Sequence, residues 1–153
     1  MMNIKENSKN KDAYKKISHL SVDIKRGIRE SFYNIGKKLI LDAKKACLKQ
    51  PKHGRTYLIR LGKSSRRHVA SAAGEAPATI TRNLLRAHDI EIQGTSRMLF
   101  GINDRVPYGR ALELGYAPRK LAPRLWLKTT IDENEKNIEK IFGKNIKEEL
   151  IKK

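Results

Sequence analysis

The sequence predicts an α+β protein, in which an antiparallel β-sheet is packed by a long N-terminal helix and a C-terminal helix. Helical apolar spacing occurs near both ends of the chain, and short β-type segments separated by turn residues lie between them. No internal repeat and no linker of biased composition interrupts the 153 residues. We therefore expect a single α+β domain over residues 12–153, preceded by a short N-terminal extension.

Positive charge dominates the composition. The chain has 34 Lys and Arg against 16 Asp and Glu, a formal net charge of +18. Such an excess attracts polyanions, with nucleic acid the commonest candidate and an anionic membrane surface the other. Residues 1–11 are polar with almost no apolar anchor, so we predict a disordered, basic N-terminus. The chain lacks a signal-peptide pattern and a membrane span, and Cys47 is its only cysteine. We expect a cytoplasmic protein without disulfides or a membrane partner.

One long amphipathic helix is predicted between Asp12 and Lys49, where an apolar position recurs every three or four residues. Pro51 ends it, because proline disfavours a helical conformation in the residue before it. The predicted helix exceeds the ordinary length of a globular helix, so we expect part of its apolar stripe to face another chain. The stripe consists of Ile17, Leu20, Ile24, Ile28, Phe32, Ile35, Leu39, Ala43 and Ala46.

A β-hairpin with a basic tip is predicted next. Residues 55–61 have β-branched and aromatic character, residues 62–65 supply a turn, and residues 66–69 return. With Tyr57 as its single aromatic, this hairpin suits phosphate contact better than base stacking. A solvated run of charges is an equal alternative for each basic side chain. The candidates for DNA contact are Arg55, Arg60, Lys63, Arg66 and Arg67.

Residues 68–79 predict an ordered loop, because small residues with one Gly and one Pro neither fill a core nor hold a long helix. Thr and Asn residues precede Leu84 and Leu85, the pattern of a loop that leads into a short anchored element. Glu75 is the first acid after Asp42. Two interpretations stay open: a solvated connection, and a loop that grips a neighbouring subunit.

Two further strands and a short helix follow. Residues 87–92 and 97–102 predict an antiparallel pair joined by a turn around Gly94. A short helix over residues 108–114 is delimited by Pro107 at its first turn and by the stop residue Gly115.

The C-terminal helix is predicted from the apolar spacing between Leu127 and Leu150. Gly143 is expected to break or fray this helix. Trp126, at its start, is expected to pack into the core, since an aromatic residue at the start of an amphipathic helix usually packs inward.

Two motifs of the chain can be compared with a known family. Residues 71–79 read Ser-Ala-Ala-Gly-Glu-Ala-Pro-Ala-Thr and continue to Asn-Leu-Leu-Arg; residues 106–127 contain Val-Pro-Tyr, Leu-Glu-Leu-Gly and Ala-Pro-Arg-Leu-Trp-Leu. They resemble the tail-completion, or head-tail joining (neck), proteins of long-tailed phages, prophages and gene transfer agents. That family usually has Ser-Ala-Pro-Gly-Glu-Pro-Pro-Ala, Leu-Glu-Phe-Gly-Thr and Arg-Pro-Phe-Leu. The resemblance runs from about residue 55 to the C-terminal helix.

The resemblance implies a structural protein that forms a homo-oligomeric ring, expected to have six subunits, through which double-stranded DNA passes. Its implied partners are a connector or stopper protein and a tail-tube or tail-terminator protein, first in the host cytoplasm and then in the virion. The basic hairpin residues would line the lumen and hold the duplex without reading its sequence. By motif position, the loops that meet neighbouring subunits are shaped by Gly74, Glu75, Pro77, Glu113 and Gly115. An ion pair of either glutamate with an arginine would supply registry there.

No pattern in the sequence is typical of catalysis. Its histidines lack metal-ligand spacing, its acids outside the C-terminal helix are scattered, and neither a Gly-rich phosphate loop nor a serine-nucleophile motif occurs. We expect no enzyme activity, cofactor, metal or small-molecule substrate. The alternative function is a monomeric, basic domain that binds nucleic acid without sequence specificity. Assembly distinguishes the two, because a neck protein forms rings or docks on tails.

Overall fold

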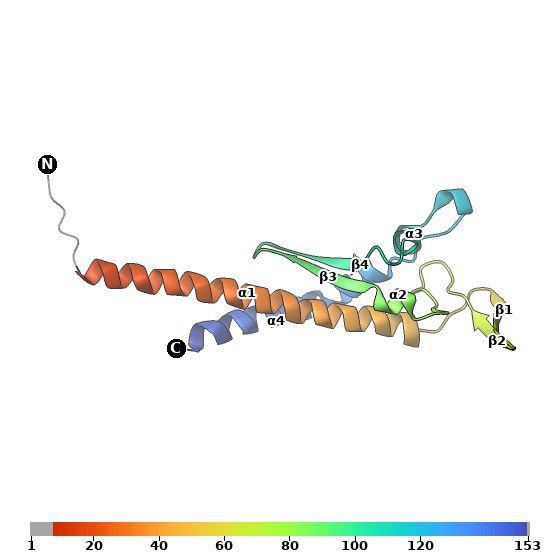
Figure 1. Cartoon of the computed structure of the whole chain (residues 1–153), viewed down its shortest axis with the longest axis horizontal. Helices are drawn as coiled ribbons and strands as arrows, with labels where there is room; N and C mark the ends of the chain where they lie inside the picture. The colour runs from red at the N-terminus through yellow and green to blue at the C-terminus, as the bar shows by residue number, and fades with distance from the viewer. Residues whose placement is uncertain (1–7, 153) are drawn as a thin grey trace.

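The structure, a computed structural model that describes residues 8–152, confirms the α+β fold (Figure 1). Helix α1 runs along the molecule, α4 packs beside it, and the β3–β4 ribbon lies over α1. The β1–β2 hairpin is a separate two-stranded sheet at the end where α1 finishes. No helix in the described part of the chain is long and apolar enough to cross a membrane. The elements are α1 (Ser8–Lys49), β1 (Thr56–Leu61), β2 (Ser64–Val69), α2 (Asn83–Arg86), β3 (His88–Gln93), β4 (Arg97–Ile102), α3 (Gly109–Leu114), a 3-10 turn (Ala117–Arg119) and α4 (Trp126–Ile151).

Helix α1 begins earlier than its apolar pattern does. It starts at Ser8, so residues 8–11 are helical and the prediction of disorder is wrong for them, while residues 1–7 lie outside the described residues. The helix has 42 residues and ends two residues before Pro51, as predicted.

Helices α1 and α4 meet through small and polar side chains. Gly27 brings the backbones together, since a Cβ there would lie 3.2 Å from the Cα of Ile146. The hydroxyl of Ser31 is buried and donates to the carbonyl oxygen of Gly27 (2.7 Å). The buried carboxylate of Glu149 accepts a hydrogen bond from Arg26 of α1. Buried polar groups require partners, so these contacts hold the two helices in one register.

Helix α4 continues through Gly143 without interruption, so the prediction that this glycine breaks or frays it is wrong. A single glycine costs a helix only about 1 kcal/mol relative to alanine. Packing of α4 against α1 on both sides of Gly143, at Asn134 and at Asn145, exceeds that cost.

The β3–β4 ribbon packs one face on α1. In its register Ile90 lies opposite Phe100, and these side chains share the inner face with His88 and Ile102. Gly36 of α1 makes the close approach possible, because a Cβ there would lie 2.8 Å from the Cγ2 of Ile90. The other face of the ribbon points away from α1.

The core lies where the C-terminal half of α1, α2 and the start of α4 converge. Trp126 is 2% exposed and confirms the prediction that it packs inside. Ala76 and Pro77 are also buried, so the prediction that the loop adds nothing to a core is wrong. Their small size lets the loop backbone pack directly against bulky neighbours. The cluster comprises Ala43, Cys47, Ala76, Leu84, Leu85, Ala87, Val106 and Trp126.

The hydrogen bond between Trp126 and His88 makes stability depend on pH. Trp126 Nε1 donates to His88 Nε2 (3.1 Å), so the imidazole is neutral, with its proton on Nδ1 facing the carbonyl oxygen of Leu85 (3.4 Å). Burial lowers the pKa of His88 below its ordinary 6.5. Neutral His88 therefore stabilises the fold fully above pH 6.5. This stabilisation is lost as the pH falls below 6.5 toward the lower pKa of the folded state, because the imidazole of the unfolded chain takes up the proton first.

We expect urea unfolding, followed by the fluorescence of the single tryptophan, to show a free energy of unfolding that falls as the pH is lowered through 6.5. His88→Gln keeps an acceptor for Trp126 but has no such titration, so its free energy of unfolding is expected to stay level over the same change of pH. An equal fall in both proteins would contradict the assignment.

Candidate functional site

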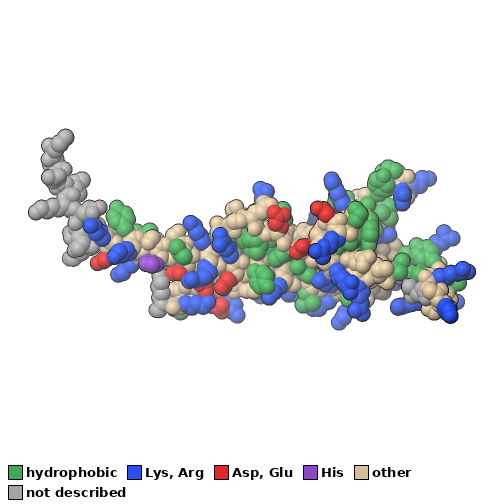
Figure 2. Space-filling view, viewed as in Figure 1, with side chains coloured by type: hydrophobic (Ala, Val, Ile, Leu, Met, Phe, Trp, Pro, Cys, Tyr) green, Lys and Arg blue, Asp and Glu red, His purple; other side chains and the backbone are tan. Residues whose placement is uncertain are grey.

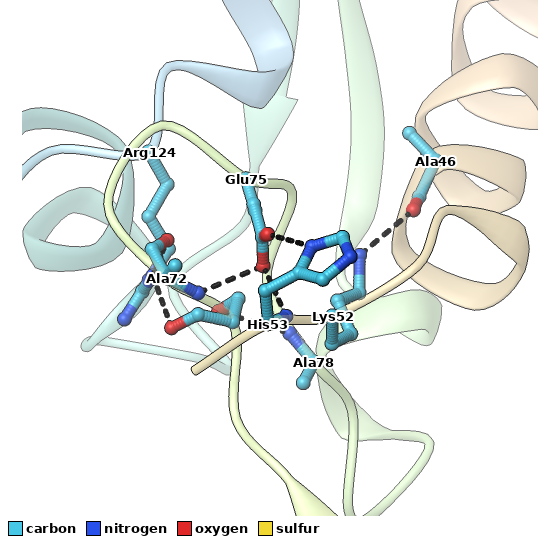
Figure 3. Close-up of polar contacts among 8 residues, drawn as sticks. Ala46, Lys52, His53, Ala72, Glu75, Ala78 and Arg124 are labelled. Atoms are coloured by element: carbon cyan, nitrogen blue, oxygen red, sulfur yellow. Dashed lines mark hydrogen bonds and ion pairs between the residues drawn. The ribbon is translucent and has the colours of Figure 1, made fainter. Parts of the chain in front are cut away.

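The two sequence motifs pack against each other in the fold. Arg124, two residues before α4, donates from Nη1 to the carbonyl oxygens of Ser71 (2.9 Å) and Ala72, and the backbone N–H of Gly74 donates to the carbonyl oxygen of Pro123 (3.2 Å). We call residues 71–79 and 113–125 the interlocked loops. Figure 3 shows the Arg124 side chain reaching into the first of them.

Glu75 closes the base of the β1–β2 hairpin. One carboxylate oxygen accepts from the backbone N–H of Ala72 (2.8 Å), which follows β2, and from that of His53 (3.1 Å), which precedes β1. The other oxygen pairs with His53 Nδ1 at 2.6 Å (Figure 3). The hydrogen bond from Ala72, followed by those from His53, lowers the pKa of Glu75 to about 2. A single ionised side chain therefore holds both stems of the hairpin.

Glu75 should stabilise the fold only while it is ionised. Its pKa falls from 4.5 to about 2 on folding, so its contribution is complete above pH 4.5 and is lost as pH falls toward 2. We expect Glu75→Gln to unfold at lower urea concentration than the parent protein at about pH 7. The difference between the two urea midpoints should be smaller at about pH 2.5. Glu135→Gln, at an exposed site on α4, is the matched control and should show no such narrowing. A gap that is independent of pH would contradict this role of the carboxylate.

Glu113 caps helix α4. Its two carboxylate oxygens accept from the backbone N–H groups of Leu127 and Lys128, each at 3.1 Å. These N–H groups have no partner within the helix, and a negative charge at a helix N-terminus is favourable. Leu125, the residue before α4, offers no side-chain cap of its own. The acid of the second motif thus joins α3 to α4.

Gly115 lies where any other residue would be strained. Its φ is +81°, and a Cβ would lie 2.8 Å from the carbonyl oxygen of Leu121 and 3.0 Å from the backbone nitrogen of Pro123. The adjacent Tyr116 pairs with Leu121 in an isolated antiparallel bridge. Glycine is therefore required for the chain to turn from α3 into the second interlocked loop.

The five predicted interface residues thus shape the loops from within the chain. Gly74 is exposed at φ +78°, Pro77 is buried, and the remaining three are half-buried. The expected pairing of Glu75 or Glu113 with an arginine is not among the contacts of the described residues, where the two acids bind His53 and backbone N–H groups. Contact with a neighbouring subunit stays a prediction for all five.

Exposed apolar side chains surround the second interlocked loop. Leu114 is 59% exposed and lines a shallow groove of about 310 Å³ between α3 and the start of α4. Tyr108, Tyr116 and Leu125 are exposed nearby. Figure 2 shows apolar side chains at this end of the molecule with basic ones beside them. An apolar surface of this kind marks a contact with another molecule more often than a solvated face.

The five candidate DNA contacts are all exposed on the β1–β2 hairpin, but they do not share one face. Paired residues in an antiparallel register point to the same side. Arg60 and Arg67 lie on the open face, beside the 72% exposed Leu58. Arg66 lies on the opposite face, beside the half-buried Ile59 and the stacked rings of Tyr57 and His68. Lys63 is at the turn, and Arg55 directly precedes β1 on the side of Arg66.

Sequence reasoning missed the role of two of the residues that build this site. His53 is one of four histidines without metal-ligand spacing, and Arg124 stands in the second motif but has no predicted role of its own. His53 pairs with the carboxylate of Glu75, 22 positions away, and Arg124 donates to the backbone carbonyl oxygens of Ser71 and Ala72, 53 and 52 positions away. Among the described residues, no group of three or more His, Cys, Asp or Glu lies close enough to hold a metal ion.

Comparison with protein-family models, with curated proteins and with solved structures finds no match to this chain. Function is therefore inferred from the two motifs and from the geometry of the loops and the hairpin.

Proposed function

We propose that this chain is a neck subunit, a structural head-tail joining protein of a long-tailed phage, prophage or gene transfer agent that assembles into a ring around double-stranded DNA. The observation that carries the proposal is that hydrogen bonds hold the basic hairpin against the rest of the chain. Glu75 binds both of its stems, and Arg124 ties the stem after β2 to the start of α4. The hairpin therefore holds its cations at a fixed place, at the end of the molecule (Figure 1).

Such a hairpin suits a passage for DNA. Lys and Arg side chains attract phosphates whatever the base sequence, and the attraction weakens with salt, so the duplex moves past them. Reading of bases would impede that movement. Six copies around an axis would present the hairpins as a cationic collar, while the apolar surface beside Leu114 would serve contacts between subunits or with connector and tail proteins.

A monomeric domain that binds nucleic acid without sequence specificity would use the same hairpin. The apolar side chains exposed around α3 favour the ring, because a solitary soluble domain rarely leaves such a surface uncovered. Assembly takes place in the bacterial cytoplasm on this proposal, and the ring ends in the virion at the head-tail junction.

Removal of the protein from particles tests the proposal. In a phage or prophage that encodes the chain, we expect a null allele to yield heads and tails that remain separate in negative-stain images, and the wild-type chain in trans to restore joined particles. Joined, infectious particles without the protein would overturn it. A chain that stays monomeric, copurifies with no connector or tail protein and binds duplex tightly would support the monomeric domain instead.

A further inference from the structure

The N-terminal part of α1 extends beyond its partner helix. Helix α4 ends at Ile151, and Glu149 in its last turn pairs with Arg26 of α1. Every residue from 11 to 22 is exposed. We call residues 11–22 the overhang; in Figure 1 it continues past the C-terminal end of α4.

The overhang carries an apolar stripe with nothing in the described structure against it. Tyr14 is 74% exposed, Ile17 64% and Leu20 46%. At this spacing the three side chains share one side of the helix, which continues through Ile24 toward the buried Ile35. Short helical segments gain most of their stability from packing of an apolar face, so this stripe calls for a partner.

The overhang is also basic. Residues 11–22 contain three lysines and a histidine against one aspartate. Lys16 lies next to the apolar stripe by helical position, and Lys15 lies on the far side of the helix. A partner of the overhang must therefore offer an apolar contact with negative charge beside it.

The outer face of the β3–β4 ribbon offers this combination. Asp89 and Glu91 point away from α1 in the ribbon register, with Arg97 at the far end and Asp104 just after β4. Three acids against one arginine give this face a negative sign, although the whole chain is strongly positive. Figure 2 shows acidic side chains over this part of the molecule.

An apolar contact and a hollow lie on the same face. Leu99, opposite Glu91, is 44% exposed. Gly101, opposite Asp89, has no side chain, and a Cβ there would meet nothing within 4 Å. The resulting hollow of about 310 Å³ is lined by the three acids together with Leu99 and Gly101.

We infer that the overhang of one copy lies on the outer face of the β3–β4 ribbon of the next copy. The sizes match, since twelve helical residues span about 18 Å and six strand residues about 20 Å. Ile17 and Leu20 then meet Leu99, and Lys16 meets Asp89 or Glu91. The contact joins two different surfaces, the head-to-tail type of contact from which rings are built when the rotation between copies closes. It specifies a subunit contact for the proposed ring and in that sense rests on the proposed function.

The overhang cannot reach the outer face of the ribbon in its own chain. Gly36 of the same helix lies under the inner face of the ribbon, against Ile90. The overhang ends 14 positions earlier, about 21 Å along a continuous helix. A helix held beneath one face of a ribbon cannot also cover the opposite face. The other basic element, the β1–β2 hairpin of a neighbour, fits less well, because Arg60 and Arg67 flank Leu58 on its open face and Val69 lies beyond Arg67, so this face offers no continuous apolar stripe.

Disulfide trapping between two singly substituted chains tests the contact. Ile17→Cys and Leu99→Cys chains are mixed and oxidised at about pH 8. Burial raises the pKa of the native Cys47 thiol to about 11, so it stays unreactive under these conditions. We expect a mixed dimer from the pair, and little from either chain alone. Leu58→Cys mixed with Leu99→Cys is the matched control for the hairpin. A mixed dimer with Leu58→Cys in place of Ile17→Cys, or no mixed dimer from either pair, would overturn the inference.

Exchange of charges across the contact gives an independent measurement. Glu91→Lys is expected to weaken self-association, measured by sedimentation equilibrium, by about tenfold. Combination with Lys16→Glu should restore it, whereas Glu135→Lys on α4 should leave it unchanged. If Glu91→Lys and the control Glu135→Lys weaken self-association equally, the effect comes from the general charge of the protein and the inference is overturned. If particles still require the protein for joining but the mixed chains give no disulfide, this subunit contact is refuted and the proposed neck function is not.

Discussion

Replacement of Gly115 by alanine is expected to destabilise the protein by about 3 kcal/mol, with a fall in the unfolding midpoint of about 10 °C. Two costs add at this position. The backbone has a φ of +81°, which a residue with a Cβ rarely adopts, and the new methyl group would lie 2.8 Å from the carbonyl oxygen of Leu121. That oxygen is held by the bridge to Tyr116, so it has little freedom to retreat.

The matched control is Gly143→Ala in α4. A Cβ at Gly143 would meet nothing within 4 Å, and the residue lies in a continuous helix. Alanine there should stabilise the protein by about 0.5–1 kcal/mol. Thermal unfolding followed by circular dichroism measures both variants. A Gly115→Ala protein as stable as its parent would show that the second interlocked loop relaxes without cost, and that Gly115 does not define its course.

Local patterns predicted most of the fold. The spacing of apolar residues located α1 and α4, and turn residues located both hairpins, because these elements form from neighbours in sequence. The errors come from tertiary contacts. Gly143 stays helical because α4 packs along α1, and Ala76 enters the core because small residues let a loop approach the larger side chains of its cluster.

The site shows the same division. The composition of the two motifs marked them as special, but nothing in the spacing of residues showed that Arg124 reaches the carbonyl oxygens of Ser71 and Ala72. The sequence predicted a basic hairpin, but side chains alternate along a strand, so four of its five candidate cations divide between two faces and Lys63 lies at the turn. Residues two positions apart on a strand share a face, so the division could be derived from the sequence only after the pairing register of β1 and β2 was known.

Neutralisation of the open face of the hairpin is expected to weaken DNA binding about 60-fold at 0.1 M salt. Arg60 and Arg67 share this face, where Leu58 and Val69 are also exposed, whereas the face of Arg66 is partly covered. Each phosphate contact contributes about 0.9 to the slope of log affinity against log salt, so loss of two lowers its magnitude by about 1.8. The variant Arg60→Gln with Arg67→Gln is titrated with duplexes of unrelated sequence at several salt concentrations.

The variant Arg55→Gln with Arg66→Gln removes the same number of charges from the other side of the hairpin. It lowers the net charge of the protein equally, so it separates a local contact from a general attraction. Its slope should change little, and neither variant should alter the preference among duplex sequences, because no bases are read. Equal loss in both pairs would mean that the duplex feels only the summed charge of the molecule, and the fixed hairpin would then have no special part in holding DNA.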